Sequence, residues 1–324
     1  HVSNLLDDNY REIEKVGGLV ALGNNPRAAV VSPDSNTLYV YNTLDFEVQV
    51  FDAEKLQTVE KIKVCEPPYS AEHQRGEILF YLALEPMVGR RWISCASCHP
   101  DGSHDARTWQ NPEGLRNTTG FLGMAQTYPI HWSADRDEAQ DFELTIRSPL
   151  MQGRGLMRGR VNEGLGEPNA GQSKDLDALA EYCNSFAVDT LSPHAAGPGK
   201  LTPAAERGRQ LFFSEAVGCA KCHSGPYYTD SSPDKPYKLH DVGTGNDDPT
   251  EKIGPAFDTP TLLGIYRTAP YLHHGKAGTL RNVIVEFNRN DKHGRTNHLK
   301  PEEIADLVEF LKSLPYELPR KNVE

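Results

Sequence analysis

The sequence contains Cys95-Ala-Ser-Cys98-His99 and, further along the chain, a second stretch of the same form, Cys219-Ala-Lys-Cys222-His223. A Cys-x-x-Cys-His motif is typical of covalent c-type haem attachment, in which two thiols bond the porphyrin and the adjacent imidazole binds the iron. A structural zinc site would need further ligands at suitable spacing, and a thioredoxin-like redox pair would need a βαβ context; neither surrounds these motifs. The two stretches therefore predict two covalently attached haem c groups, with His99 and His223 as iron ligands.

Length and composition indicate a chain of several domains without a transmembrane segment. The 324 residues suffice for two or three domains, and no run of about 18 uncharged apolar residues is present. The formal net charge is −11 at pH 7, and the pI is near 5.6. This acidic balance argues against nucleic acid or an anionic membrane as the main partner.

The haem motifs also bear on the compartment. Haem c is attached on the far side of a translocating membrane, so we expect an exported protein in the periplasm or an equivalent oxidising compartment. We interpret His1 as the start of a mature chain whose leader has been removed. Four of the six cysteines are assigned to haem. The other two, Cys65 and Cys183, could form a disulfide there or remain as buried free thiols.

Residues 1–65 differ in character from the rest of the chain. Four short segments rich in β-branched and aromatic residues alternate with turn-rich pieces and predict four strands, at 27–31, 37–41, 47–52 and 58–64. Their amino-acid sequence resembles that of one blade of the propellers built from Tyr-Val-Thr-Asn-type repeats. A propeller needs several blades, and no second copy follows in this chain. The alternative is a small sheet that folds against the haem domain.

After Glu66-Pro67-Pro68 the pattern becomes helical and is duplicated. Residues 70–80 and 202–212 each precede a haem motif and share Arg-Gly-x-x-Leu-Phe, and each begins with a Ser or Thr suited to cap a helix. A final amphipathic helix is expected at 301–314, and 192–199 has the composition of a linker. We therefore predict a mainly α fold, with two tandem cytochrome c-type domains at 66–191 and 192–324, preceded by the small antiparallel, propeller-blade-like sheet.

Further motifs resemble the bacterial di-haem cytochrome c peroxidases and MauG. They are Arg116-Asn117-Thr118, Trp132, Asp258-Thr-Pro-Thr-Leu262 and Thr268-Ala-Pro-Tyr-Leu-His273. The resemblance covers about residues 70–315 and implies that Trp132 lies between the two haems. It also implies a calcium ion between the domains, bound by Asn117 and by the backbone carbonyls of Thr268 and Pro270; such oxygens suit this cation.

The second haem departs from the family pattern. The family has Met or Tyr as the far iron ligand nineteen residues after the Thr of Thr-Ala-Pro, but counting from Thr268 reaches Phe287, which cannot bind iron. The loop that follows offers His293 and His298. We favour His293, because the glycine after it lets the backbone approach the porphyrin closely.

The first haem is expected to keep an open iron. The only histidine in the short loop after the motif is His104, which is too near His99 in sequence to reach across the porphyrin. An open iron binds a small molecule such as peroxide, dioxygen or nitric oxide and needs a nearby proton donor. The candidates are Asp141 and His131, with Trp132 as the electron path; a solvated acidic helix start is the alternative for Asp141.

These residues predict a two-haem oxidoreductase, in which electrons enter at the His223 haem, pass Trp132 and reach a small molecule at the His99 haem. The family's catalytic Gln and Glu are not preserved in register, which argues against simple peroxide reduction. A di-haem chain with a single blade is similar to the gamma subunits of hydrazine synthases. That resemblance implies reduction of nitric oxide to hydroxylamine, a propeller chain and a larger haem subunit as partners, a donor cytochrome, and the lumen of the anammoxosome. The alternatives are a peroxidase, a MauG-like oxidant, or an electron-carrier subunit with both irons closed.

Overall fold

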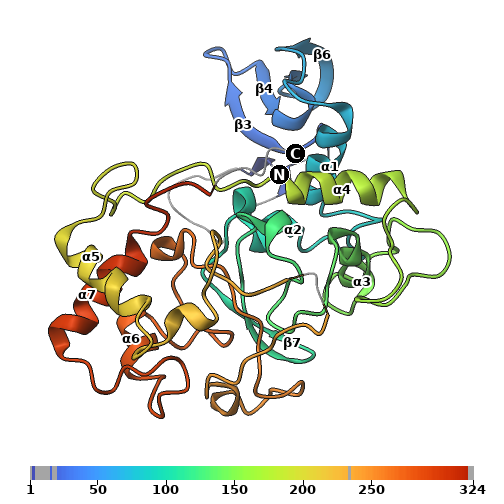
Figure 1. Cartoon of the computed structure of the whole chain (residues 1–324). Coiled ribbons are helices and arrows are strands. Elements are labelled where there is room, and N and C mark those ends of the chain that lie inside the picture. The colour runs from blue at the N-terminus through green and yellow to red at the C-terminus, as the bar shows by residue number, and fades with distance from the viewer. Residues whose placement is uncertain (1, 4–14, 17–19, 233–234, 320–324) are drawn as a thin grey trace. The chain divides into compact units, whose positions relative to one another are not determined.

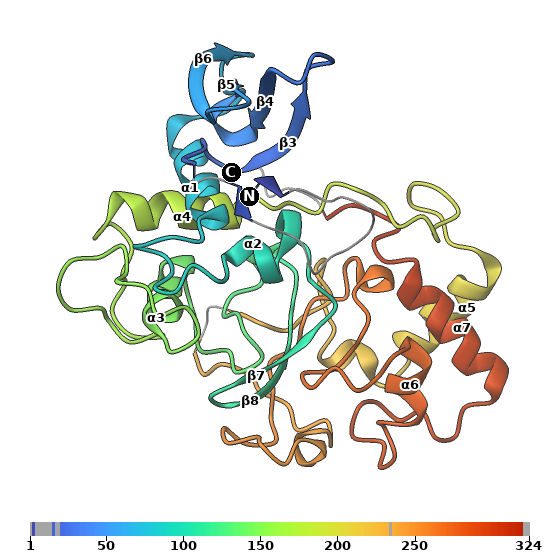
Figure 2. The ribbon, with the colours of Figure 1, turned by 180° about the vertical axis from the view of Figure 1, so that it is seen from behind.

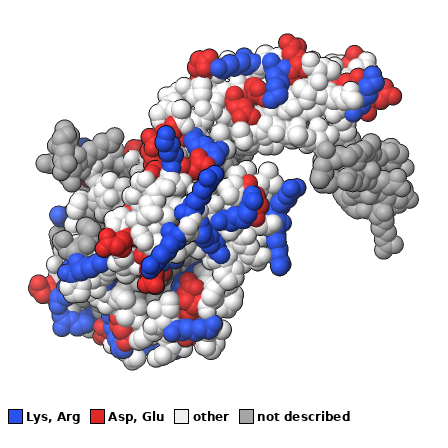
Figure 3. All heavy atoms as spheres, turned by 90° about the vertical axis from the view of Figure 1, so that its right-hand side faces the viewer, with Lys and Arg blue, Asp and Glu red and all other residues white. Residues whose placement is uncertain are grey.

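The computed structural model describes residues 2–3, 15–16, 20–232 and 235–319, and the chain divides into two compact units, residues 1–82 and 83–324. Each unit is described by itself. None of the helices in these residues is long and apolar enough to cross a membrane. Acidic and basic side chains are interspersed over the face drawn in Figure 3.

The first unit contains an antiparallel sheet whose four strands pair in chain order (Figure 1). The strands are β3 (Pro26–Val31), β4 (Thr37–Asn42), β5 (Glu47–Asp52) and β6 (Gln57–Lys63), and a separate pair joins β1 (Val2–Ser3) to β2 (Lys15–Val16). Val40, Val50 and Phe51 on the two central strands are buried, whereas every residue of β3 and β6 is exposed. The four predicted strands are confirmed, and the outer two bury no side chain against the described residues of their own unit.

Helix α1 (Ala71–Tyr81) belongs to the same unit as the sheet. The side-chain oxygen of Ser70 accepts a hydrogen bond from the backbone N–H of His73, as expected of a helix cap. Gln74 donates to the carbonyl of Leu44, which fastens the helix to the turn after β4. The predicted domain boundary at residues 65/66 stays a prediction.

The second unit is built from short helices joined by long loops (Figures 1 and 2). Its helices are α2 (Cys95–Cys98), α3 (Phe142–Arg147), α4 (Lys174–Asn184), α5 (Pro203–Phe212), α6 (Leu280–Val285) and α7 (Pro301–Lys312). One hairpin pairs β7 (Thr108–Asn111) with β8 (Gly114–Asn117). Single 3₁₀ turns lie at Thr43–Asp45 in the first unit and, in the second, at Pro100–Gly102, Met124–Gln126, Ala139–Asp141, Cys219–Lys221, Gly245–Asp247 and Ile265–Arg267. The mainly helical and irregular fold with a small N-terminal sheet agrees with the prediction.

Helices α5 and α7 lie side by side in both ribbon views and form the core of the C-terminal part. A Cβ atom at Gly208 of α5 would lie 1.9 Å from the carbonyl oxygen of Asp306 in α7, so the two backbones touch at this point. The rings of Phe212 and Phe310 pack beside the crossing, with centroids 5.2 Å apart. Glycine at the crossing and apolar residues around it therefore determine how these helices hold the second haem motif.

Candidate functional site

A cavity of about 360 Å³ lies beside the second haem motif. Its lining includes Cys219, Cys222 and His223, and His293 from the loop before α7. The ring centroids of His223 and His293 are 6.2 Å apart. Two metal–imidazole bonds of about 2 Å, with about 1.1 Å from each nitrogen to its ring centre, would place two ligands of one metal about 6.2 Å apart. The two rings therefore stand at the separation that one iron between them requires.

The loop that carries His293 is held by a buried amide. The side chain of Asn288 accepts a hydrogen bond from the backbone N–H of His293 at 2.8 Å, and it donates to the carbonyl of Gly294 and the hydroxyl of Thr296. Gly294 has φ +78°, and a Cβ atom there would come within 3.3 Å of the Val217 carbonyl. The glycine thus permits a close approach of this loop to Val217 and to the Cys219 sulfur, while its approach to a porphyrin stays a prediction.

The imidazoles of His223 and His293 favour the neutral form, which is the form that binds a metal. Burial lowers the pKa of His293 to about 4 and also lowers the pKa of His223. The Nδ1 atom of His223 lies 3.1 Å from the carbonyl oxygen of Tyr228, which leaves Nε2 for a metal. His298, the other candidate, is exposed and does not line the cavity.

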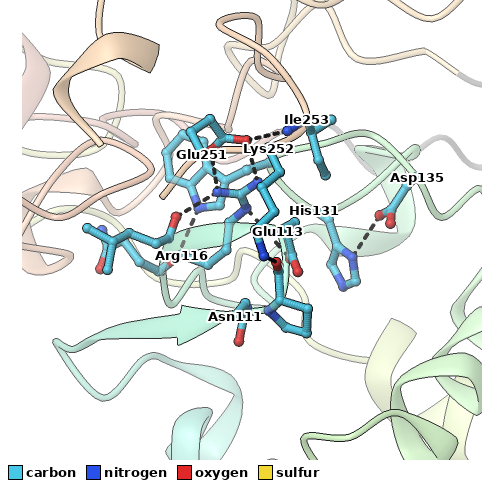
Figure 4. A network of polar contacts seen from close by, with 12 residues as sticks. Asn111, Glu113, Arg116, His131, Asp135, Glu251, Lys252 and Ile253 are labelled. Carbon is cyan, nitrogen blue, oxygen red and sulfur yellow. Dashed lines mark hydrogen bonds and ion pairs between the residues drawn. The ribbon is translucent and has the colours of Figure 1, made fainter. Parts of the chain in front are cut away.

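A smaller cavity of about 120 Å³ lies beside the first haem motif. His99 lines it, packs edge-on against the ring of Phe121 at 4.6 Å, and has its pKa lowered to about 4 by burial. Among the described lining residues the other imidazole is His131, whose Nδ1 atom lies 2.8 Å from an Asp135 carboxylate oxygen (Figure 4). Among the residues that the structure describes, no second imidazole forms a ring pair with His99 like that of His293 with His223.

The ring nitrogens of His104 bond to backbone groups outside the cavity beside His99. Its Nδ1 atom accepts a hydrogen bond from the backbone N–H of Ala106, so its Nε2 atom donates to the carbonyl of Arg267, at 2.9 Å. Both nitrogens therefore have partners, and the side chain does not line the cavity beside His99.

Trp132 lines both cavities. Its indole N–H donates to the carbonyl of Asn117 at 2.9 Å, and its own carbonyl accepts from the backbone N–H of Asp258 at 2.9 Å. The ring is thereby fixed between the end of β8 and the segment that follows Phe257. A side chain held in this way between two haem cavities suits an electron path.

The three residues predicted to bind calcium line one cavity, and their role as ligands stays a prediction. The side chain of Asn117 lies with its Nδ2 atom 2.6 Å from the carbonyl oxygen of Pro270, and its buried Oδ1 atom has no hydrogen-bond partner. Asn117, Thr268 and Pro270 all line the larger cavity. The orphaned amide oxygen of Asn117 is one ligand of the kind that calcium takes, whereas the Pro270 carbonyl accepts the Asn117 amide N–H in this structure.

The hairpin that carries Asn117 is anchored by a partly buried ion pair. Arg116 donates to both carboxylate oxygens of Glu251, at 2.7 and 3.2 Å, and Lys252 donates to the carbonyl of Pro112 at 2.6 Å (Figure 4). These contacts tie β8 to the loop after residue 248. The position of the Asn117 amide is therefore determined by long-range contacts rather than by its hairpin alone.

Comparison with known proteins places this geometry in a family. Residues 205–315 match the family model described as Cytochrome c. The chain is 37 % identical over 310 residues to hydrazine synthase subunit gamma of Kuenenia stuttgartiensis, covering 78 % of this chain and 80 % of that protein. It is 35 % identical over 284 residues to the methylamine utilization protein MauG of Methylorubrum extorquens, covering 75 % and 77 %. The chain belongs to the di-haem cytochrome c peroxidase and MauG family.

Solved structures of this family agree. A chain of Kuenenia stuttgartiensis hydrazine synthase under xenon pressure has a TM-score of 0.58 and 26 % identity, covering 93 % of this chain and 98 % of that chain. A MauG-like protein associated with microbial copper homeostasis has a TM-score of 0.54 and 21 % identity, covering 78 % and 91 %. A match over 93 % of the chain must include much of the N-terminal sheet, so the hydrazine synthase likeness extends beyond the haem domains. Two covalently attached haem c groups follow from this membership and from the two motifs.

Asp141 is less well placed for this family's chemistry than the sequence suggested. It is 2 % exposed, accepts a hydrogen bond from the Asn169 amide at 2.9 Å, and is absent from the residues that line the cavity beside His99. Burial raises its pKa. The acidic stretch is thus not a solvated helix start, and the catalytic role of Asp141 stays a prediction.

Two features near the haem motifs were not singled out from the sequence. His240 lies between the Cys222 sulfur, 3.6 Å from its Nδ1 atom, and the Asp230 carboxylate, 2.9 Å from its Nε2 atom. Asp258, quoted only as part of a motif, lines both cavities. The presence of a carboxylate before Thr-Pro-x-Leu was the available signal for Asp258. No spacing rule links His240 to the haem motif, because a long loop separates them.

Cys65 and Cys183, the two cysteines outside the haem motifs, differ from each other. Cys65 is exposed and Cys183 is buried in α4, both as free thiols. Burial raises the pKa of Cys183 well above its ordinary value, which makes it a weak nucleophile.

Proposed function

We propose that the chain is a di-haem oxidoreductase subunit with one closed and one open iron. The observation that carries the proposal is the asymmetry of the two cavities: His293 faces His223, and no described side chain offers an equivalent imidazole opposite His99. When bound, the haem c at His223 would supply a one-electron carrier, and the haem c at His99 would supply an iron that binds a small molecule.

The roles of the side chains follow from their places. Cys95, Cys98 and Cys219, Cys222 hold the porphyrins, and His99 and His223 hold the irons. His293 excludes small ligands from the second haem, and Trp132 provides the path between the cavities. His131, fixed by Asp135, is the lining residue of the first cavity that can move a proton; Asp141 is a second candidate that would act through an intervening group.

For the reaction we propose reduction of nitric oxide to hydroxylamine within a hydrazine synthase-type complex. Each nitric oxide molecule takes up three electrons and three protons to give one hydroxylamine, and a donor cytochrome supplies the electrons at the closed haem. Identity to hydrazine synthase subunit gamma over most of both chains supports this substrate. The alternative with specific support is a MauG-like oxidant, because the identity to MauG is nearly as high.

For the assembly we propose an exported subunit whose residues 1–65 pack against a propeller chain, followed by cytochrome c domains at 66–191 and 192–324. The fully exposed outer strands β3 and β6 support the docking, with Val30 and Val59 each 64 % exposed. A larger haem subunit would complete the complex. The compartment would be the periplasm, or the anammoxosome lumen for a hydrazine synthase. Calcium at Asn117, Thr268 and Pro270 would join the two haem domains.

The test is the spectrum of the reduced holoprotein with carbon monoxide or nitric oxide added. We expect one haem to bind the gas and the other to remain low-spin. Binding at neither haem would replace this proposal with an electron-carrier subunit. Product analysis then distinguishes the substrates: hydroxylamine from nitric oxide supports the hydrazine synthase reading, whereas turnover of hydrogen peroxide alone supports the peroxidase or MauG-like one.

A further inference from the structure

Among the described residues, Asp258 is the one acidic residue that lines both cavities. It lines both the cavity at His99 and the cavity at His223. Its backbone N–H donates to the carbonyl of Trp132 at 2.9 Å, so it sits next to the residue that also lines both. The segment that follows, Thr259–Thr261, also lines both cavities.

The carboxyl group of Asp258 has two neutral hydrogen-bond donors, the Ser231 hydroxyl and the Thr259 backbone N–H. The Ser231 hydroxyl lies 2.7 and 2.9 Å from its two oxygens, and no lysine or arginine in the described residues forms an ion pair with it. The neighbouring carboxylate of Asp230 adds negative charge, although Asp230 is itself paired with His240 at 2.9 Å. An acidic group with only neutral donors and a like charge nearby has little to stabilise its ionised form.

These surroundings place its titration in the neutral range. Burial, with a smaller contribution from Asp230, raises the pKa of Asp258 to about 7, against the lowering effect of the hydrogen bonds from Ser231 and the Thr259 backbone. An added electron in either cavity would raise this pKa further, because negative charge nearby disfavours the carboxylate.

We propose that Asp258 is a proton acceptor shared by the two haem cavities: its carboxylate gains one proton when one electron enters either cavity, and the carboxyl loses that proton when the electron leaves. This inference rests on the two-haem function proposed above and deepens it. One electron and one proton arrive together, so the net charge around Trp132 is unchanged. A low-dielectric site carries electrons more readily when their charge is compensated in place.

Several other titratable or charged groups face the two cavities or this carboxyl. They are Asp230 and His240 beside Ser231, His131 and its partner Asp135, and, at the larger cavity, Arg267, His273 and the exposed pair Asp241–Lys292. Porphyrin carboxylates would add to these. Asp241 provides a matched control, because it is an aspartate of the same cavity whose pKa is lowered by Lys292 and does not titrate near neutrality.

The experiment measures the midpoint potential of each haem in the holoprotein by spectroelectrochemistry, from about pH 5 to about pH 9. In the wild-type protein we expect the midpoint potentials to be independent of pH below the pKa that Asp258 has when the haems are oxidised. Above that pKa the potentials should fall by up to about 59 mV per pH unit, which corresponds to a tenfold change in equilibrium constant. In Asp258→Asn this dependence should disappear. In Asp241→Asn it should persist, even if the potentials themselves change.

A second variant guards against misfolding of the first. Ser231→Ala removes the hydroxyl that favours the carboxylate, so it should raise the pKa of Asp258 and move the sloping region to higher pH. An Asp258→Asn protein that keeps the wild-type pH dependence would overturn the proposal. So would a Ser231→Ala protein whose potentials fall over the same pH range as the wild type, or wild-type potentials that do not change with pH. Gas binding measured on the same samples reports on the open iron separately, so failure of the catalytic proposal is distinguishable from failure of this one.

Discussion

At the scale of single residues, the two haem sites differ in what faces the attached histidine. His293 is half-buried, lies with its ring centroid 6.2 Å from that of His223 and is held by Asn288, whereas His298 is exposed. The sequence offered both histidines in one loop and favoured His293 on the argument of the adjacent glycine. The structure supplies the additional reason: the Asn288 amide bonds the backbone on both sides of the histidine.

The first prediction concerns this ligand. His293→Ala should convert the second haem from low-spin to high-spin and leave the first haem unchanged, because it removes one axial nitrogen from a closed iron. Absorption and electron paramagnetic resonance spectra measure the change. His298→Ala is the matched control and should have the wild-type spectra. An unaltered spin state in His293→Ala would exclude His293 as the ligand.

The second prediction concerns Asp141. If it delivers protons to the first cavity, Asp141→Asn should slow reduction of the bound ligand by about 10²- to 10⁴-fold while binding changes little. Its burial and its bond to Asn169 mean that it would act through an intervening group. Stopped-flow measurements separate binding from reduction. Equal reduction rates in the variant and the wild type would leave Asp141 with a purely structural role.

At the scale of elements, the crossing of α5 and α7 determines the geometry of the second haem domain. The duplicated Arg-Gly-x-x-Leu-Phe pattern predicted α5, and the amphipathic pattern predicted α7 to within two residues at its C-terminus. That the glycine of the pattern is the contact point between the two helices emerges only in three dimensions, because periodicity identifies a buried face but not its partner.

The third prediction follows from that contact. Gly208→Ala should destabilise the protein by about 1–3 kcal/mol, because the added methyl group meets the rigid carbonyl of Asp306. The gain in helix propensity of about 1 kcal/mol does not offset a backbone clash of this kind. Chemical denaturation gives the difference. Gly278→Ala, where the nearest atom to the new Cβ is 3.9 Å away, is the control and should change stability by less than about 0.5 kcal/mol.

The fourth prediction concerns the junction of β8 with the Thr268–Pro270 segment. Calcium should raise the melting temperature of the chelator-treated protein, because an ion that binds only the folded state stabilises it in proportion to the logarithm of its concentration. Asn117→Ala should abolish the effect by removing the orphaned amide oxygen. Magnesium is the control cation and should have little effect, since it requires a tighter octahedral site. A calcium response that persists in Asn117→Ala would contradict the assigned ligand.

At the scale of the whole molecule, the N-terminal sheet is notable because both of its outer strands are exposed along their whole length. Its outer strands expose Val30, Val31, Val59 and Ile62. Exposed apolar strands at both edges of one sheet are unfavourable in an isolated protein and invite pairing with another chain. The haem-bearing unit, by contrast, buries the apolar faces of its helices internally.

The fifth prediction tests this surface. Val30→Lys with Val59→Lys should release a co-purifying propeller chain without altering the haem spectra, because a charged side chain on each outer strand penalises a buried interface. Deletion of residues 1–64 should have the same effect, and native mass spectrometry measures both. Lys61→Ala, on the same strand but polar, serves as the control. A wild-type protein that is monomeric and well behaved would refute the subunit proposal.

The sequence by itself determined the number of haems, the four N-terminal strands, the helices at the duplicated pattern and at 301–314, and the family, because covalent haem attachment and helix or strand periodicity are encoded in short, local patterns. Trp132 and Asn117 could likewise be proposed from motif spacing, and His293 from the glycine that follows it. Only the tertiary structure decided which residues line the same cavity: that Asp258 and Trp132 line both cavities, that Asp141 is not among the residues lining the cavity beside His99, and that Asn288 holds His293. Those relations join residues far apart in the chain through long loops, whose paths depend on buried ion pairs and backbone hydrogen bonds that no local pattern encodes.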